Sequence, residues 1–232
     1  LQTDPLAYTW NFATRVPRIV ALTPEPGSSI AAGRTRLAVS FSGPVSEQLI
    51  SNDQFSISHL GRLLPLPLEE FSYDPVAYRV SFPAVDLVSG SSYRAAVGAR
   101  TSGPLAQFVG LQDSTWTFVT RTPAVAAQVP AVDEDGVSVA DPTIQITFTE
   151  PVAQQDVNDF SITVRALDAV DAPTEIIGIT GFGADETGKI ISFVPAGGLR
   201  PFSHYRIDVA SEVLGDLAEA GIGWSFRTAA LL

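Results

Sequence analysis

The sequence lacks most of the residue types on which enzyme chemistry depends. It contains no cysteine and only two histidines, His59 and His204, in 232 residues. Without cysteine the chain has no thiolate nucleophile and no thiolate metal ligand. A serine hydrolase needs a base beside its nucleophile, and the sequence has no Gly-x-Ser-x-Gly motif. We therefore expect surface or packing roles for both histidines and predict that the chain is not an enzyme.

Positive charge and long apolar runs are also scarce. Acidic residues outnumber basic ones by 25 to 14, which gives a formal net charge of −11. Such a surface repels phosphate backbones, so nucleic acid is not an expected partner. No apolar run approaches the roughly 18 residues of a membrane-spanning helix, and we predict no membrane insertion. The 45% of hydrophobic residues is nevertheless enough to fill two cores of ordinary size.

What the sequence does contain is a repeated five-residue signature: an aromatic residue, a polar residue, Phe, any residue and Thr. It occurs at residues 10–14, 116–120 and 224–228 and begins with Trp each time. The intervals of roughly 107 residues match one small domain. We therefore predict two complete copies of one module, in a piece of a longer tandem array. The predicted boundaries are 1–15 for the closing strand of a truncated preceding module, 16–121 for the first copy and 122–232 for the second.

Other segments align between the two copies and alternate between apolar and polar residues. A period of two places every second side chain on one face, as in a half-buried β-strand. Proline follows the first aligned strand in both copies and ends it, because proline cannot donate to the ladder. The aligned sets are Leu37, Val39 and Phe41 with Ile144, Ile146 and Phe148; Phe55-Ser56-Ile57 with Phe160-Ser161-Ile162; and Val80-Ser81-Phe82 with Ile191-Ser192-Phe193.

A tyrosine follows a leucine at the same spacing in each copy: Tyr93 after Leu87 and Tyr205 after Leu199. This pattern is typical of a tyrosine corner, in which the hydroxyl group bonds the backbone a few residues upstream in a β-sandwich. Helical periodicity is almost absent, apart from an expected turn of helix within residues 211–220. We predict an all-β fold of two tandem Ig-like or fibronectin-III-like β-sandwiches. Both linkers contain proline, which stiffens them, so we expect an extended arrangement.

The order of these motifs resembles a known family. Pro-x-x-Gly, a strand ending in Phe-[Ser/Thr]-x-Pro-Val, Phe-Ser-Ile, Leu-x5-Tyr, Gly-Asp-Leu-Ala and Trp-x-Phe-x-Thr are together similar to the bacterial Ig-like domain first described in S-layer proteins. The second copy includes Gly215-Asp216-Leu217-Ala218, whereas residues 101–113 replace this turn in the first. The resemblance implies a secreted or cell-surface spacer, S-layer segment, adhesin stalk or accessory module of a secreted enzyme, without catalysis. A macroglobulin-like protein, also a series of sandwiches, is a further alternative.

One acidic cluster is a candidate metal site. Asp133, Asp135 and Asp141 lie in or beside the turn at residues 133–136, which follows the second linker. Carboxylate oxygens clustered on a turn suit calcium, which takes about six to eight oxygen ligands. The spacing matches no EF-hand loop, and the first copy has Pro24-Glu25-Pro26-Gly27 at this place. Two interpretations stay open: a calcium site that stiffens the joint between the modules, and a solvated acidic turn.

Two further patterns are weaker signals. Residues 183–190 approach the spacing of a phosphate-binding loop, but Ile190 stands where Ser or Thr is required and a strand follows. We predict a hairpin there, without a nucleotide. Phe71, Tyr73 and Tyr78 cluster in the first copy and would offer a carbohydrate platform if they were exposed.

The predicted partners follow from the repeats. The strand segment at residues 8–14 needs a neighbour, because an isolated strand is not stable in water. Two interpretations stay open: strand addition to β-structure outside the two modules, and a contact with a neighbouring molecule that has no biological role. Contacts between neighbouring modules of the same polypeptide are expected in addition. As a whole the sequence predicts a non-catalytic extracellular or cell-surface module pair, a stiff spacer or a surface-layer or adhesin stalk segment. The alternative is a ligand- or carbohydrate-binding accessory module, which would show an exposed aromatic or apolar patch on one copy only.

Overall fold

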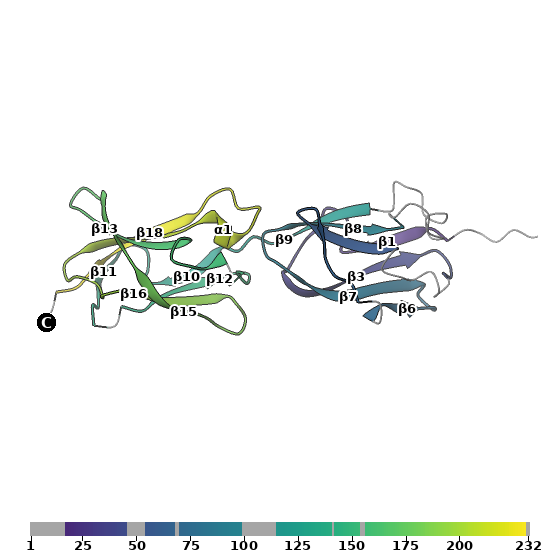
Figure 1. The fold of residues 1–232 in the computed structure, drawn as a ribbon, viewed down its shortest axis with the longest axis horizontal. Helices are drawn as coiled ribbons and strands as arrows, with labels where there is room; N and C mark the ends of the chain where they lie inside the picture. Colours follow the sequence, from purple (N-terminus) through teal and green to yellow (C-terminus); the bar gives the residue numbers. More distant parts are fainter. Residues whose placement is uncertain are drawn as a thin grey trace, which may run out of the picture.

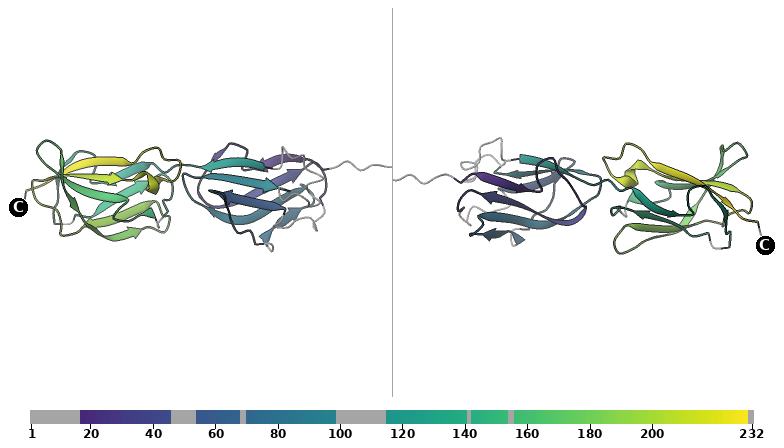
Figure 2. Two further views of the ribbon diagram at one scale, coloured as in Figure 1. Left: turned by 45° about the horizontal axis from the view of Figure 1, so that its top comes forward. Right: turned by 180° about the vertical axis from the view of Figure 1, so that it is seen from behind.

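The chain forms two β-sandwiches that lie end to end (Figure 1). The further views in Figure 2 show the same extended arrangement. The predicted all-β class with tandem sandwiches is therefore confirmed, while the predicted closing strand in residues 1–15 lies outside the described residues. The computed structural model describes residues 17–45, 54–67, 70–98, 115–140, 142–153 and 156–230.

The first sandwich consists of two sheets. One has the strand order β1-β3-β7-β6 and the other the order β2-β9-β8-β4-β5. Neighbouring strands are antiparallel, except that β2 runs parallel to β9. The strands are β1 (Ile19–Thr23), β2 (Ser29–Ile30), β3 (Gly33–Phe41), β4 (Phe55–His59), β5 (Arg62–Leu63), β6 (Ser72–Asp74), β7 (Arg79–Leu87), β8 (Ser92–Val97) and β9 (Thr115–Thr120).

The second sandwich repeats this arrangement strand for strand. Its sheets have the orders β10-β12-β16-β15 and β11-β18-β17-β13-β14, and β11 runs parallel to β18. The expected turn of helix is α1 (Ser211–Leu214), between β17 and β18. The strands are β10 (Val125–Val129), β11 (Glu134–Val137), β12 (Ile144–Phe148), β13 (Ile162–Leu167), β14 (Pro173–Ile177), β15 (Ile179–Ala184), β16 (Ile190–Pro195), β17 (His204–Val209) and β18 (Ile222–Thr228).

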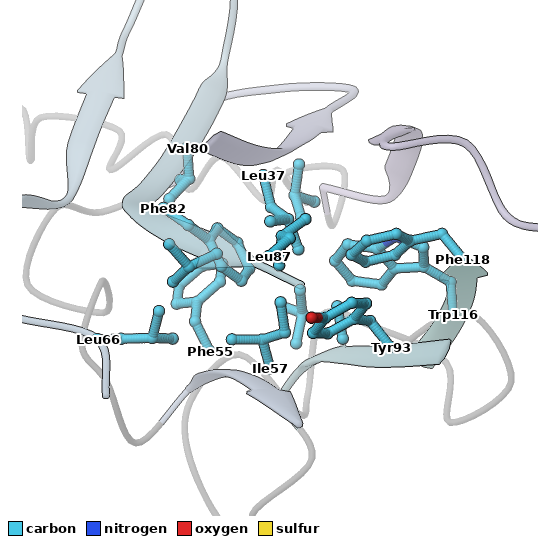
Figure 3. Packing of buried hydrophobic residues seen from close by; sticks show 14 of the residues in the cluster. Leu37, Phe55, Ile57, Leu66, Val80, Phe82, Leu87, Tyr93, Trp116 and Phe118 are labelled. Atoms are coloured by element: carbon cyan, nitrogen blue, oxygen red, sulfur yellow. The ribbon is translucent and has the colours of Figure 1, made fainter. Parts of the chain in front are cut away.

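Each sandwich has its own hydrophobic core, built by the period-two alternation of its strands. In the first core the Phe82 ring packs against Phe55 and Trp116 between the two sheets, with centroid distances of 4.9 and 6.3 Å (Figure 3). Trp116 and Trp224, the first residues of the repeated signature in β9 and β18, are each 4% exposed. The signature therefore marks the strand that closes each core.

Both predicted tyrosine corners are present. Tyr93 and Tyr205 are buried, and each hydroxyl oxygen accepts a backbone N–H five residues upstream. The donors are Val88 and Arg200, and both distances are 2.8 Å. These bonds fix the turn between β7 and β8 and the turn between β16 and β17 in the same way.

One predicted alignment was wrong. Phe55 of β4 corresponds to Ile162 of β13 and not to Phe160, because Phe55 and Ile162 each pair with the last residue of the neighbouring strand, β8 or β17. Phe160 precedes β13 and is 87% exposed. The cause is a turn at Asn158, whose side-chain oxygen accepts the N–H of Phe160 (2.9 Å) before the strand begins. Two similar Phe-Ser-Ile triplets therefore hold different places in the fold.

The segment that resembles a phosphate-binding loop is a hairpin, as predicted. It connects β15 to β16, and the Asp185 carboxylate closes it by accepting the N–H groups of Lys189 and Ile190, both at 2.9 Å. The Thr187 hydroxyl donates to the same carboxylate. Asp185 therefore stabilises a turn.

The aromatic cluster of the first copy packs against the first core. The Phe71 ring centroid lies 5.4 Å from that of Phe55 and 5.7 Å from that of Phe82. Tyr73 and Tyr78 are half-buried against the same core. These three rings therefore do not form an exposed carbohydrate platform.

Candidate functional site

The two sandwiches contact each other through two turns, and we call this contact the junction. One turn, residues 88–91, connects β7 to β8 in the first sandwich. The other, residues 214–217, begins at the last residue of α1 and lies in the first part of the connection to β18 in the second sandwich. The N–H of Leu217 donates to the carbonyl oxygen of Gly90 at 2.8 Å. This backbone bond joins the turns in the manner of neighbouring strands.

Two glycines make the close approach of these backbones possible. Gly90 has φ +60°, and a Cβ at this position would overlap the carbonyl oxygen of Leu214. Gly215 has φ +96°, and its Cβ would lie 2.5 Å from the carbonyl oxygen of Ser89 and 2.9 Å from Gly90 Cα. Glycine tolerates both the positive φ and the contact. Any side chain at either position would push the two sandwiches apart.

Side chains hold the junction on both sides of this backbone contact. The Ser89 hydroxyl donates to the carbonyl oxygen of Pro151 at 2.6 Å. On the linker, Arg121 Nε lies 3.3 Å from Oε1 of Glu150, a carboxylate whose residue is 8% exposed. Both the β7–β8 turn and the linker therefore contact the second sandwich.

A histidine–aspartate pair forms a third part of the junction. His59 Nε2, at the end of β4, lies 2.8 Å from Asp216 Oδ2, and the Ser91 hydroxyl donates to the same oxygen at 3.5 Å. The His59 ring stacks on Tyr93 with a centroid distance of 5.0 Å. Burial, with a smaller contribution from the Asp216 carboxylate, raises the pKa of Tyr93. The junction thus reaches the tyrosine corner of the first sandwich.

Sequence reasoning missed the junction. It recognised Gly215-Asp216-Leu217-Ala218 as the turn before the last strand, but Ser91 and Asp216 are 125 residues apart and nothing local links them. One signal was available: the first copy has Gly90 where the second copy has Phe202. A glycine at a position that holds a bulky residue in the other copy indicates a close backbone approach.

The structure places two of the three predicted calcium ligands, Asp133 and Asp135. The Asp133 N–H donates to the carbonyl oxygen of Ser225 (2.7 Å), and its carboxylate accepts the Ser225 hydroxyl (3.2 Å). Asp135 is exposed, and Asp141 lies outside the described residues. Within the described ranges no group of three or more His, Cys, Asp or Glu is placed to hold a metal ion. The calcium site stays a prediction, and a thermal melt in EDTA compared with one in millimolar calcium tests it.

The second histidine has a partner of the same kind. His204 Nδ1 lies 2.8 Å from Asp171 Oδ1, and His204 pairs with Arg227 near the C-terminal end of β18. In the part of the chain that the structure describes, no helix is long and apolar enough to cross a membrane.

These features define the chain as a tandem pair of Ig-like β-sandwiches joined by a direct contact. Residues 119–228, which contain the second sandwich, match the family model of the bacterial Ig-like domain. The resemblance inferred from the sequence motifs is confirmed over this part of the chain. No curated protein matches the sequence.

Several solved structures show a low degree of similarity to the chain. PcoC, a methionine-rich copper resistance protein from Escherichia coli, is 18% identical, with 46% of this chain and 98% of PcoC covered and a TM-score of 0.37. The N-terminal part of the bacterial S-layer protein SbsC is 15% identical, with 92% of this chain and 44% of that chain covered and a TM-score of 0.33. A titin fragment is 9% identical, with 92% and 99% covered and a TM-score of 0.32.

Proposed function

We propose that this chain is a non-catalytic structural module pair, a stiff spacer in a larger bacterial protein outside the cell or at its surface. Residues 16–121 and 122–232 are the two proposed modules. The observation that carries the proposal is the junction, in which two backbones meet at Gly90 and Gly215. The match to the bacterial Ig-like domain supports the location. Segments of surface layers and adhesin stalks are the settings in which such a spacer would act.

A spacer works by keeping a fixed length, and the junction supplies what that requires. A flexible linker would let the sandwiches reorient freely. Three contacts act at the same interface: the backbone bond from Leu217 to Gly90, the hydrogen bond between His59 and Asp216, and the bond from Ser89 to Pro151. Together they favour one relative orientation.

The relative orientation can be measured by residual dipolar couplings on the full chain. If the junction is rigid, one alignment tensor fits both sandwiches. Gly215→Ala should force the turns apart, so that two different tensors are needed and small-angle X-ray scattering shows a less extended average shape. Gly197→Ala is the matched control, because Gly197 also has positive φ (+76°) but has open space around its Cβ position.

Two outcomes would contradict the proposal. The wild-type chain could require two independent tensors, which would mean that the modules move freely. Alternatively, Gly215→Ala could leave the single tensor unchanged while Gly197→Ala behaves in the same way, which would mean that the glycine contact does not set the orientation.

The alternative function, a ligand- or carbohydrate-binding accessory module, requires a surface feature that one sandwich has and the other lacks. The second sandwich has a groove that is lined in part by Phe160, an exposed residue that precedes β13.

A further inference from the structure

A groove of about 360 Å³ crosses the outer face of the sheet that contains β13, β17 and β18. Its walls combine an exposed aromatic ring with charged and hydroxyl side chains. The lining residues that the argument uses are Phe160, Thr163, Arg165, Arg206, Asp208 and Gly223. The inward neighbours of these residues fill the second core, so the groove and the core lie on opposite faces of one sheet.

Two arginines lie directly opposite each other in this groove. Arg165 of β13 pairs with Arg206 of β17 in the sheet register. Like charges in such a pair repel each other, so a sheet selected for stability alone would avoid them. Asp208 lies between them: its Oδ1 is 2.7 Å from Arg206 Nε, and its Oδ2 is 3.8 Å from Arg165 Nε. One carboxylate neutralises only one of the two guanidinium groups.

The cluster therefore keeps a local positive charge in a chain whose formal net charge is −11. Arg165 Nε has no hydrogen-bond partner among the described residues. The side chains of Arg165 and Arg206 are 39% and 45% exposed, so part of each side chain reaches solvent. Paired guanidinium groups present parallel N–H donors that match a carboxylate.

A glycine makes room for the charged pair. A Cβ on Gly223 of β18 would lie 2.5 Å from Asp208 Oδ1 and 2.6 Å from Arg206 Nη2. Any larger residue at this position would displace both side chains. The positions of the Asp208 and Arg206 side chains thus depend on the absence of a side chain at Gly223.

The first sandwich lacks this arrangement at the equivalent positions. Ser58 stands opposite Arg94 there, as Arg165 stands opposite Arg206. Ala96 takes the place of Asp208, and Thr115 takes the place of Gly223. The shared fold does not require the cluster, so we look for its reason in binding.

Phe160 completes the site. Its side chain lies at the groove and is 87% exposed, and the Asn158 side chain fixes its backbone by accepting its N–H at 2.9 Å. An exposed aromatic face beside polar groups suits a ring with apolar C–H faces and polar edges. A sugar ring has this character, and a carboxylate on that ring would meet the arginines.

We propose that this groove binds a carboxylate-bearing saccharide of the uronic acid type. The ring stacks on Phe160, the carboxylate accepts N–H groups from Arg165 and Arg206, and ring hydroxyl groups bond Thr163 and Asp208. This site is independent of the junction, so its failure would leave the spacer function untouched, and the reverse also holds.

The test is an NMR titration of the full chain with trigalacturonate, using its methyl ester as the uncharged control. We expect a dissociation constant of about 1 mM or tighter and chemical-shift changes confined to the groove. The methyl ester should bind at least about tenfold more weakly, because it cannot pair with the arginines. Added salt should weaken the binding of the acid only.

Matched variants locate the site. Arg206→Ala should weaken binding at least about tenfold, and Phe160→Ala by about fivefold. Arg94→Ala is the control, because Arg94 holds the same position in the first sandwich. Gly223→Ala keeps every charge but displaces the pair, so it should also weaken binding, while a thermal melt confirms that each variant is folded.

The proposal is wrong if about 10 mM trigalacturonate produces no shifts at the groove. It is also wrong if the methyl ester binds equally well, or if Arg94→Ala weakens binding as much as Arg206→Ala.

Discussion

The two sandwiches contain the same turn, at residues 88–91 in the first and 200–203 in the second, but only the first of these turns touches another sandwich. A threonine at the end of the last strand holds both. Thr120 Oγ1 and Thr228 Oγ1 donate to the first carbonyl oxygen of their turn, at 2.6 Å each. Together with the tyrosine corners, these bonds give the two turns the same backbone.

The two turns differ in their first three residues, and the third is glycine in one turn and phenylalanine in the other. Gly90 and Phe202 both have positive φ, +60° and +52°, so the backbone conformation is shared. Gly90 leaves space for the carbonyl oxygen of Leu214, whereas the Phe202 side chain is 81% exposed. Hydrogen bonds thus define the shape of the turn, and the absence of a side chain at Gly90 lets the backbone at Leu214 approach it.

The largest expected effect comes from substitutions at a core position that both sandwiches share. Phe82 and Phe193 hold equivalent core positions and are both 0% exposed. Phe82→Ala and Phe193→Ala should each lower the free energy of unfolding of their own sandwich by about 3–5 kcal/mol, because each leaves a cavity. Urea denaturation followed by NMR signals from each sandwich measures both. A loss below about 1 kcal/mol at one site would show that the two cores are not equivalent.

Exchanging the two turn residues tests the difference directly. Gly90→Phe should cost about 1–3 kcal/mol through overpacking and separate the alignment tensors of the sandwiches. Phe202→Gly should change the free energy of unfolding by less than about 0.5 kcal/mol, because the ring is exposed. Equal effects of the two substitutions would show that the size of this residue does not control the junction.

Removing one hydroxyl group in each tyrosine corner gives a smaller effect. Tyr93→Phe and Tyr205→Phe should each cost about 1 kcal/mol, because the N–H of Val88 or Arg200 loses its acceptor. Tyr93→Phe should also disturb the His59 signals at the junction, since the His59 ring stacks on Tyr93. Thermal melts and NMR spectra of both variants check this, and unchanged His59 signals would separate the corner from the junction.

The smallest expected effect is on the dependence of stability on pH in acid. Hydrogen bonds lower the pKa of two hairpin aspartates below the ordinary value: bonds from the backbone of Ala77 and Val76 at Asp74, and chiefly the Thr187 hydroxyl at Asp185. A lowered folded-state pKa means that these groups contribute stability above the ordinary value of 3.8 and lose it as the pH falls through the folded-state pKa.

A carboxyl carbon NMR titration should therefore place both aspartates below the ordinary pKa. Asp74→Asn and Asp185→Asn should make stability slightly less dependent on pH below about 4. A titration at or above the ordinary value would show that the hairpin bonds do not form in solution.

Elements with clear alternation and a following proline were predictable from sequence, such as β3 and β12. The exposed position of Phe160 was not predictable, because the Phe-Ser-Ile pattern does not show that a turn at Asn158 precedes β13 and that the strand begins only at Ile162. The calcium hypothesis at Asp133, Asp135 and Asp141 rests on composition alone and stays a prediction. The groove also escaped the sequence, since Arg165 and Arg206 lie on different strands and their pairing depends on register.

By itself, the sequence determined the repeat, the all-β class and the tyrosine corners, because these depend on period-two alternation and on spacings of a few residues. Only the tertiary structure decided how the copies meet and which charges lie side by side. The reason is physical: alternation specifies which face of a strand is buried, but not which backbone lies against Gly90 or which side chain faces Arg206. Those contacts depend on the packing of segments far apart in the chain.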